Sequence, residues 1–291
     1  FILRSLGYQT DTVRFVPGDP TFLQLRLAPA TIIAPSFELV SVRAESYQPV
    51  AQTNLSENQI DALNYGKDFP MLLDQTPSVV THSDAGAGIG YTGLRIRGTD
   101  QTRINVTING IPINDPESMG VFWVNMPDLS SSMNSVQIQR GVGTSSQGAG
   151  AFGASININT NEFNPKAFAA YRFDGGMFNT LRHSAEFGTG QLPGGFFVEG
   201  RLSKTNSDGF IDRSFSDLKS FFLKGGYLKE NTRLRFNIFS GAEQTYQAWY
   251  GVPEAIWKDQ PQFNSAGTDF GLRDQPYANE TDNYQQDHYQ L

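Results

Sequence analysis

The sequence contains no cysteine and only three histidines, His82, His183 and His288. The missing cysteine excludes disulfides, thiolate metal sites and thiol nucleophiles, and three scattered histidines argue against a histidine-rich metal site. Charged residues make up only 18% of the chain, compared with about 25% in a typical soluble domain. The net charge of −7 also lacks the basic surplus expected of a dedicated nucleic-acid binder.

Long apolar runs are missing as well. No stretch of about 18 apolar residues exists, so the sequence predicts no transmembrane helix, and no signal peptide is recognisable. The chain begins and ends within strand-like segments, so we expect a longer protein around it. What is abundant is phenylalanine (22), tyrosine (11) and glycine (29), a mixture that favours many strands joined by turns.

The motifs of common enzymes are not convincing here. Two stretches match G-x-G-x-x-G, one at Gly88, Gly90 and Gly93 and the other at residues 148–153. Both are followed by predicted strands, whereas a dinucleotide site needs a helix at that point. No G-x-S-x-G motif is present, and His82 beside Asp84 is more typical of a loop pair than of a catalytic dyad. We therefore expect neither an enzyme nor a bound cofactor.

The first zone, residues 1–44, is small and β-prone. Residues 1–6, 12–16 and 22–27 are predicted strands, and the segment 17–20 (PGDP) is a strong turn signal. Residues 28–35 form a linker with two prolines, and the β-prone ELVSVRA follows at 38–44. We assign 1–30 to the end of a β-sandwich and 31–44 to a linker.

The second zone, residues 45–162, alternates helix and strand signals and predicts a compact α+β domain. Ser56 and Gln59 form a capping box before a short helix with Ile60 and Leu63 turned inward. Strands are predicted at 94–98, 103–109, 135–140 and 155–160, and Asn109-Gly110 is a hairpin turn signal. The long loop at 112–128 combines carboxylates and aromatics, which is consistent either with ligand contact or with packing on its own domain.

The third zone, residues 163–291, contains five segments in which apolar and polar residues alternate. They lie at 167–174, 180–188, 196–205, 219–229 and 232–245, and a sixth begins at Tyr284. Short turns between them alternate with long loops, which is the pattern of a transmembrane β-barrel. A soluble β-sandwich alternates in the same way, but its strands are usually shorter.

The middle zone contains a series of linked motifs. They are LRIRG (94–98), VTINGIPIND (106–115) and SVQIQRGVGTSSQGAGAFGASININT (135–160), after a helix that leads to TPSVV (76–80). In these motifs, residues 94–160 resemble the plug domain of TonB-dependent outer-membrane receptors. The third zone resembles the first strands of the receptors' 22-stranded barrel. The first zone, with LGYQT at 6–10, resembles the tail of a carboxypeptidase-regulatory-like domain. The expected fold is a mixed α+β plug domain (45–162), then the first five to six strands of a transmembrane antiparallel β-barrel (163–291), after a β-sandwich remnant.

This resemblance implies a receptor in the outer membrane of a Gram-negative bacterium. Such a receptor binds a scarce extracellular solute and imports it with energy from the inner membrane, through TonB with ExbB and ExbD. A ferric siderophore or other iron complex is the leading cargo. Cobalamin, an oligosaccharide or a peptide are alternatives, as is a structural or adhesive barrel without energy coupling. Outer-membrane lipid is an implied partner, and nucleic acid is not.

The resemblance also assigns roles to residues. The TonB box, which pairs by strand addition, loosely matches Glu38, Leu39, Val40, Ser41 and Val42. The plug arginines that face barrel glutamates in the family match Arg97 and Arg140, a residue type that suits bidentate carboxylate pairing.

The solute site is expected at the outward loops of the plug, at 84–93 and 112–125, with a wall from the third long loop. The candidate contacts are His82, Asp84, Tyr91, Asp115, Glu117, Phe122 and Trp123 in the plug, and Trp249 and Tyr250 in the wall.

Overall fold

The computed structural model describes residues 2–3, 8, 11–12, 27, 43–44, 48–142, 150–229, 232–268, 276–277 and 279–291. The chain divides into two compact units, Phe1–Leu39 and Val40–Leu291. In the first unit, strand β1 (Ile2–Leu3) pairs antiparallel with strand β2 (Asp11–Thr12). The proposed TonB box at 38–42 lies outside the described residues, and the assignment of 1–30 to a β-sandwich stays a prediction.

The second unit begins with a small mixed sheet. Its strands are β3 (Gln52–Ser56), β8 (Ser135–Arg140), β9 (Ala154–Asn159), β6 (Ile104–Ile108) and β7 (Ile111–Pro112), in that order across the sheet. β6 and β9 run parallel, and the other neighbours run antiparallel. A separate hairpin joins β4 (Val79–Ser83) to β5 (Thr92–Ile96). The predicted strands at 94–98, 103–109, 135–140 and 155–160 are therefore confirmed to within a few residues.

Short helices connect these strands. They are α1 (Glu57–Leu63), α2 (Phe69–Leu72) and the 3₁₀ turns η1 (Gln101–Arg103), η2 (Trp123–Asn125) and η3 (Leu129–Ser132). The capping box is present, since the Ser56 N–H donates to Gln59 Oε1 at 3.0 Å, and Ile60 is buried as predicted. In the described part of the chain, no helix combines the length and apolar character needed to cross a membrane.

The Asn109-Gly110 turn forms as expected. Both residues have positive φ, 55° and 83°, which is the backbone of a type I′ hairpin turn. It joins β6 to β7 in antiparallel register. The long loop at 112–128, which carries several candidate solute contacts, follows this hairpin.

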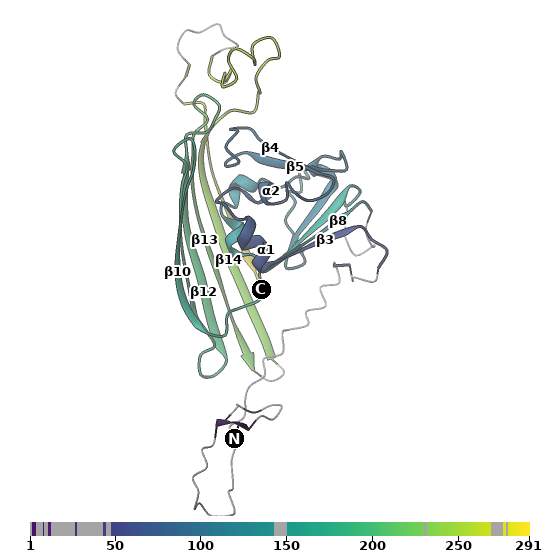
Figure 1. Ribbon diagram of the computed structural model, residues 1–291, viewed down its shortest axis with the longest axis vertical. Helices are drawn as coiled ribbons and strands as arrows, with labels where there is room; N and C mark the ends of the chain where they lie inside the picture. Colours follow the sequence, from purple (N-terminus) through teal and green to yellow (C-terminus); the bar gives the residue numbers. More distant parts are fainter. Residues whose placement is uncertain are drawn as a thin grey trace, which may run out of the picture. The chain divides into compact units, whose positions relative to one another are not determined.

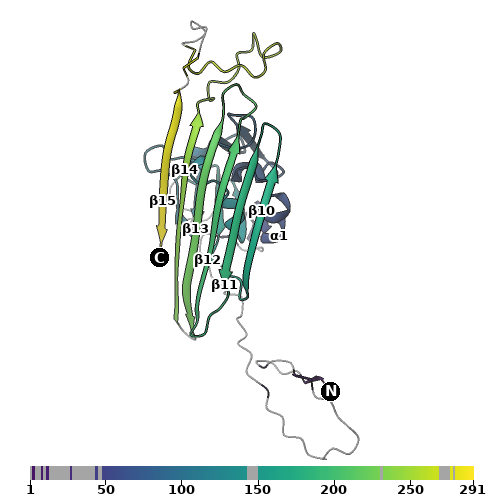
Figure 2. The same cartoon turned by 90° about the vertical axis from the view of Figure 1, so that its left-hand side faces the viewer.

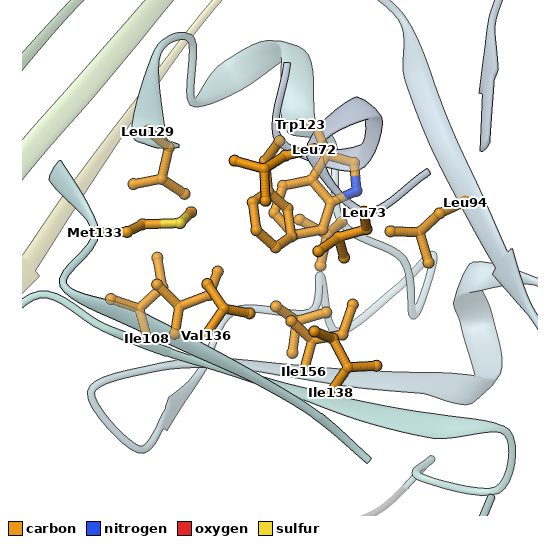
Figure 3. Packing of buried hydrophobic residues seen from close by; sticks show 14 of the residues in the cluster. Leu72, Leu73, Leu94, Ile108, Trp123, Leu129, Met133, Val136, Ile138 and Ile156 are labelled. Atoms are coloured by element: carbon orange, nitrogen blue, oxygen red, sulfur yellow. The ribbon is translucent and has the colours of Figure 1, made fainter. Parts of the chain in front are cut away.

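The helices cover one face of the mixed sheet and close its hydrophobic core. Ile138, Ile156 and Val136 project from the sheet and are fully buried, and Leu73 packs against them from the helical side. Figure 3 shows Val136, Ile138 and Ile156 on the sheet side of this core, and Leu73 beside Trp123 on the helical side. Burial of large aliphatic and aromatic side chains is the dominant stabilising term here.

The third zone forms one antiparallel sheet of six strands in chain order. They are β10 (Ala167–Gly175), β11 (Leu181–Thr189), β12 (Phe196–Ser207), β13 (Ser216–Lys229), β14 (Thr232–Tyr246) and β15 (Thr281–Gln290). Figure 2 shows them side by side in that order. All five alternating segments and the sixth strand are confirmed, and the strands of up to 15 residues exceed the usual sandwich length.

The two faces of this sheet differ as the alternation predicts. The inward face packs on the plug, and Phe222 and Phe239 on neighbouring strands join the plug's core. The outward face carries Tyr171, Leu202 and Leu234, each more than half exposed. In the described part of the chain nothing packs over that face (Figure 1). A soluble sandwich would cover such a face with a second sheet, so the arrangement favours a barrel wall.

Candidate ligand site between plug and sheet

The plug is attached to the six-stranded sheet by a buried ion cluster centred on Asp128. Its carboxylate contacts two guanidinium groups from neighbouring strands, Arg182 Nη1 at 2.6 Å and Arg201 Nη1 at 2.8 Å. Arg182 is 2% exposed, Arg201 4%, and the Asp128 side chain is fully buried. Because charges buried this deeply need partners, the cluster fixes the plug against β11 and β12.

Further polar groups complete the cluster. Arg182 also binds the Asp174 carboxylate at 2.7 Å and donates to Asn64 Oδ1 at 2.9 Å. Arg201 Nε donates to Ser132 Oγ at 2.8 Å. Burial by itself raises the pKa of Asp128, but the two arginines outweigh this, and the net effect lowers that pKa. Asp128 is therefore ionised at neutral pH.

A second close contact lies beside this cluster, on β14. Gly241 faces the plug, and a Cβ at this position would overlap the carbonyl oxygen of Asn125. Next to it, Ser220 Oγ donates to the carbonyl of Pro127 at 2.8 Å. The missing side chain of Gly241 lets the plug backbone approach β14. The segment 125–128 is therefore held at one end by this contact and at the other by the Asp128 cluster.

A cavity of about 280 Å³ opens where this plug segment meets β14 and β15. The plug contributes Tyr91, Ile113, Asp115, Gly120, Val121, Phe122, Asn125 and Met126, and the sheet contributes Glu243, Asp282, Asn283, Tyr284, Gln286 and His288. The cavity is close to the usual lower size of small-molecule sites.

Tyr91 links the two walls of the cavity. Its hydroxyl donates to Asp282 Oδ2 at 3.2 Å, and its ring and that of Trp249 form a T-shaped pair with 5.9 Å between centroids. Burial and the carboxylates of Glu243 and Asp282 raise the pKa of Tyr91. The phenol therefore stays protonated and serves as a hydrogen-bond donor.

The cavity is acidic and contains unsatisfied polar groups. Asp115, Glu243 and Asp282 line it, and no lysine or arginine is among its described lining residues. The backbone N–H of Ser118, 2.7 Å from Asp115 Oδ1, lowers the pKa of that carboxyl. Asn125 Oδ1 and His288 Nε2 are buried without a hydrogen-bond partner among the described residues. A bound solute with donor groups would satisfy such atoms.

Several predicted contacts meet here. Tyr91, Asp115 and Phe122 line the cavity. Trp249 packs on Tyr91, and Tyr250 packs on Trp249 with 6.2 Å between their ring centroids. These five residues therefore form one aromatic and acidic group, although they come from three separate segments of the chain.

Other predicted contacts lie elsewhere. His82 is exposed on β4 and covers Gly93, and Glu117 is exposed at the tip of its loop. Asp84 is half-buried, where burial raises the pKa of its carboxyl. None of the three lines the cavity.

Trp123, which was predicted as a solute contact, lies in the hydrophobic core instead. It is only 3% exposed and its ring packs on Phe69 with 4.7 Å between centroids. The neighbouring residue in the sequence, Phe122, is exposed and lines the cavity. The loop therefore uses one aromatic for the core and the other for the surface, and we assign Trp123 to the core.

The sheet side of the cavity was not predicted from the sequence. Asp282, Tyr284, Gln286 and His288 occupy alternate positions of β15, and Glu243 lies directly opposite Tyr284. The period of two in this segment is the signal that would have grouped them on one face. Their position beside Tyr91 depends on the strand register, which the sequence does not state.

Arg97 and Arg140 lie on the plug away from this cavity. Arg97 is exposed with φ of 53°, and Arg140 Nη1 donates to Thr53 Oγ1 at 2.9 Å. Neither forms an ion pair with any acid that the structure describes, so their pairing with barrel glutamates stays a prediction. The ion pairs observed between plug and sheet have the opposite polarity, with the acid on the plug.

Comparison with known families identifies the middle of the chain. Residues 44–155 match the model of the TonB-dependent receptor plug domain. No curated protein matches the chain.

Solved structures share the fold of the plug and sheet together. The ferric yersiniabactin uptake receptor FyuA from Yersinia pestis aligns with a TM-score of 0.58 and 14% identity, over 75% of this chain and 35% of its own. The P. aeruginosa receptor FpvA, bound to a heterologous pyoverdine, gives 0.60 and 14%, over 71% and 27%. The ferric-catecholate import receptor Fiu from E. coli K12 gives 0.58 and 16%, over 71% and 29%. The chain thus spans about a third of the length of these receptors.

Proposed function

Because residues 44–155 match the plug domain of TonB-dependent receptors, we propose that this chain forms part of an outer-membrane transporter that captures a scarce extracellular solute and imports it. The observation that carries the proposal is the cavity between the plug loops and strands β14 and β15, which has aromatic, acidic and unpaired polar groups. A site at the junction of plug and wall couples binding to the plug, because a solute there contacts both.

The energy for import comes from the inner membrane in this proposal. TonB, driven with ExbB and ExbD, would pair with residues 38–42 by strand addition, in which main-chain hydrogen bonds supply the affinity. The Asp128 cluster and the close contact at Gly241 hold the plug against the wall. The force transmitted by TonB would have to loosen these contacts.

A ferric siderophore or another iron complex is the proposed cargo. The support is indirect, since FyuA, FpvA and Fiu are named for ferric or pyoverdine ligands. A copper transporter, OprC, aligns almost equally well, with a TM-score of 0.56, so the fold does not select iron. Cobalamin, an oligosaccharide or a peptide are alternative cargoes, and a barrel without energy coupling is the alternative function.

Two measurements test the proposal on the intact receptor. Native mass spectrometry of the protein purified from its own membrane identifies the bound solute. Deletion of residues 38–42 should then abolish uptake of that solute while its binding and the assembly of the receptor persist. Unchanged uptake would rule out the proposed energy coupling.

The cavity is tested separately with matched acid-to-amide variants. Asp115→Asn changes a lining residue, whereas Glu117→Gln changes an exposed acid two positions away that does not line the cavity. We expect Asp115→Asn to change solute affinity by about tenfold, which is typical of a central contact, and Glu117→Gln to leave it within about twofold. Equal effects of the two variants would place the solute elsewhere.

A further inference from the structure

We propose that the outward face of β11, β12 and β13 carries a binding site for the phosphate headgroup of a membrane lipid, formed by Lys204 and Lys219 beside His183. This inference rests on the proposed function, because it requires the outward face of the sheet to stand in a membrane. It concerns the face opposite the plug, so it is independent of the solute cavity.

The strand register places the three basic side chains in one row. His183 on β11 lies directly opposite Lys204 on β12, and Lys204 lies directly opposite Lys219 on β13. The two lysine charges are therefore directly opposite each other, an arrangement that is destabilising in a sheet. Such a row is favourable when an anion sits between the side chains, and phosphate is an anion that lysine commonly binds as a point charge.

The acids near the row leave one lysine without a partner. Asp217 forms an ion pair with Lys204. Lys219 is exposed and contacts no carboxylate in the described part of the chain. The Tyr171 hydroxyl, 2.6 Å from His183 Nδ1, adds a further polar group at the end of the row. The charge of Lys219 is therefore available to an external anion.

The surface around the row suits a lipid better than a free ion. A shallow hollow of about 520 Å³ contains the row and is lined next to it by apolar side chains. Ala185, Leu202 and Phe221 occupy the outward positions next to the row on the same three strands, and Leu202 is 62% exposed. A headgroup on the lysines would place its acyl chains over these residues.

The position of the row along the strands fits a membrane boundary. On β13 the outward positions run from Lys219 through Phe221, Leu223, Gly225 and Tyr227 to Lys229, with no charge between the two lysines. Ten residues span about 33 Å of strand, and a tilt of about 40° reduces this to about 25 Å, the height of the apolar band of a barrel. Lys219 thus stands at one edge of the band and Lys229 at the other.

The end of the sheet at which the row lies indicates the leaflet. Lys204 and Lys219 are close to the connection 208–215, and the longer connection 247–280 leaves the sheet at the same end (Figure 2). Barrels carry their long loops on the extracellular side and short turns on the other. The occupant we propose is therefore a phosphorylated lipid of the outer leaflet.

The test measures retained lipid on the intact receptor by native mass spectrometry after exchange into detergent. The probes are lipid A, lipid A without its phosphates, and inorganic phosphate. The variants are the double substitution Lys204→Gln with Lys219→Gln, and Lys229→Gln as a matched control at the opposite edge. Each surface lysine is worth roughly a fivefold change in affinity for an anionic membrane, so the pair should lower lipid A retention about 30-fold.

The expected result is strong retention of lipid A, weak retention of the dephosphorylated form, and loss only in the double variant. Equal retention of lipid A by wild type and double variant, or of both lipid forms by wild type, would overturn the proposal. Binding of inorganic phosphate as tight as that of lipid A would overturn it as well, because the apolar part would then contribute nothing.

A second measurement separates this failure from failure of the proposed membrane location. Leu223→Trp places a fluorophore on the outward face, away from the lysines. Quenching by brominated lipid reports contact with acyl chains whatever the headgroup. Quenching together with unchanged lipid A retention in the double variant would refute the headgroup site alone, and absence of quenching would refute the membrane location on which it rests.

Discussion

The substitution Asp128→Asn tests how the plug is attached to the wall. It keeps the size of the side chain but removes the one carboxylate that contacts both Arg182 and Arg201. Arg182 would retain Asp174 as a partner. Among the described residues, Arg201 would retain direct hydrogen bonds only to the hydroxyl groups of Ser132 and Ser220. Glu186, opposite it on β11, would be its remaining electrostatic partner, and the buried guanidinium would lose its directly bonded carboxylate.

The magnitude follows from the burial of the three groups. Removal of one partner from a buried ion pair costs about 3–5 kcal/mol, because the remaining charge stays desolvated. Because Arg182 keeps Asp174, we take the lower end, about 3 kcal/mol. This corresponds to an increase of about 150-fold in the population in which the plug detaches locally from the sheet.

Hydrogen–deuterium exchange of the intact receptor measures that population. Peptides that contain η3 and the facing part of β12 should exchange about 150-fold faster in Asp128→Asn when exchange follows local opening. Asp100→Asn is the control, because Asp100 is exposed and, among the described residues, accepts hydrogen bonds only from Thr102 in its own turn. The double variant Asp128→Asn with Arg201→Met should recover part of the protection, because it removes the buried guanidinium.

Two results would contradict this reasoning. Exchange in Asp128→Asn within twofold of Asp100→Asn would show that the cluster does not attach the plug. The second is additivity. If the free-energy change of local opening in the double variant equals the sum of the changes in the two single variants, Asp128 and Arg201 are not coupled.

Three further predictions concern packing and pH. Gly241→Ala should destabilise the plug–wall contact by about 1–3 kcal/mol, because its Cβ overlaps the plug backbone; an unfolding midpoint equal to that of Gly176→Ala, where the nearest atom is 3.5 Å away, would contradict this. Trp123→Ala should cost about 3–5 kcal/mol in unfolding free energy, whereas Phe122→Ala should cost little, and similar losses in denaturant titrations would refute the core assignment. Burial raises the pKa of Asp68 to about 8, so the folded state holds a proton that the unfolded state releases, and stability falls as pH rises from about 4 to 8. In Asp68→Asn, the thermal unfolding midpoint should depend less on pH over this range. A pH dependence equal to that of the wild type would exclude Asp68 as its cause.

The local elements were predictable because their causes are local. The capping box at Ser56 and the Asn109-Gly110 turn depend on residues within a few positions of each other, and both formed. The strands of the third zone were predicted from alternation alone. Three plug strands were missed, β3 (Gln52–Ser56), β4 (Val79–Ser83) and the two-residue β7 (Ile111–Pro112). β3 and β4 are short and largely polar and become strands only by pairing with β8 and β5.

The solute cavity was only half predictable. The carboxylates and aromatics of the plug loops predicted their side of the cavity. Composition alone does not indicate which aromatic of the Phe122-Trp123 pair is buried. The sheet side could not be predicted, because Tyr91 and the Asp282 that it contacts are 191 positions apart in the chain. Their contact is set by the register of β15 on β14. A shift of that register by one residue would turn Asp282 to the opposite face of the sheet.

The sequence by itself predicted the strands of the third zone and their two faces, because hydrophobic periodicity and turn residues act over short distances. The class of the protein came instead from motifs that resemble the plug domain. Only the tertiary structure decided what those faces meet. It paired Asp128 with two arginines more than 50 residues away, buried Trp123, and aligned Lys204 with Lys219 on the outward surface. These contacts depend on strand register and on the path of loops between distant segments, and neither is encoded in any single stretch of the chain.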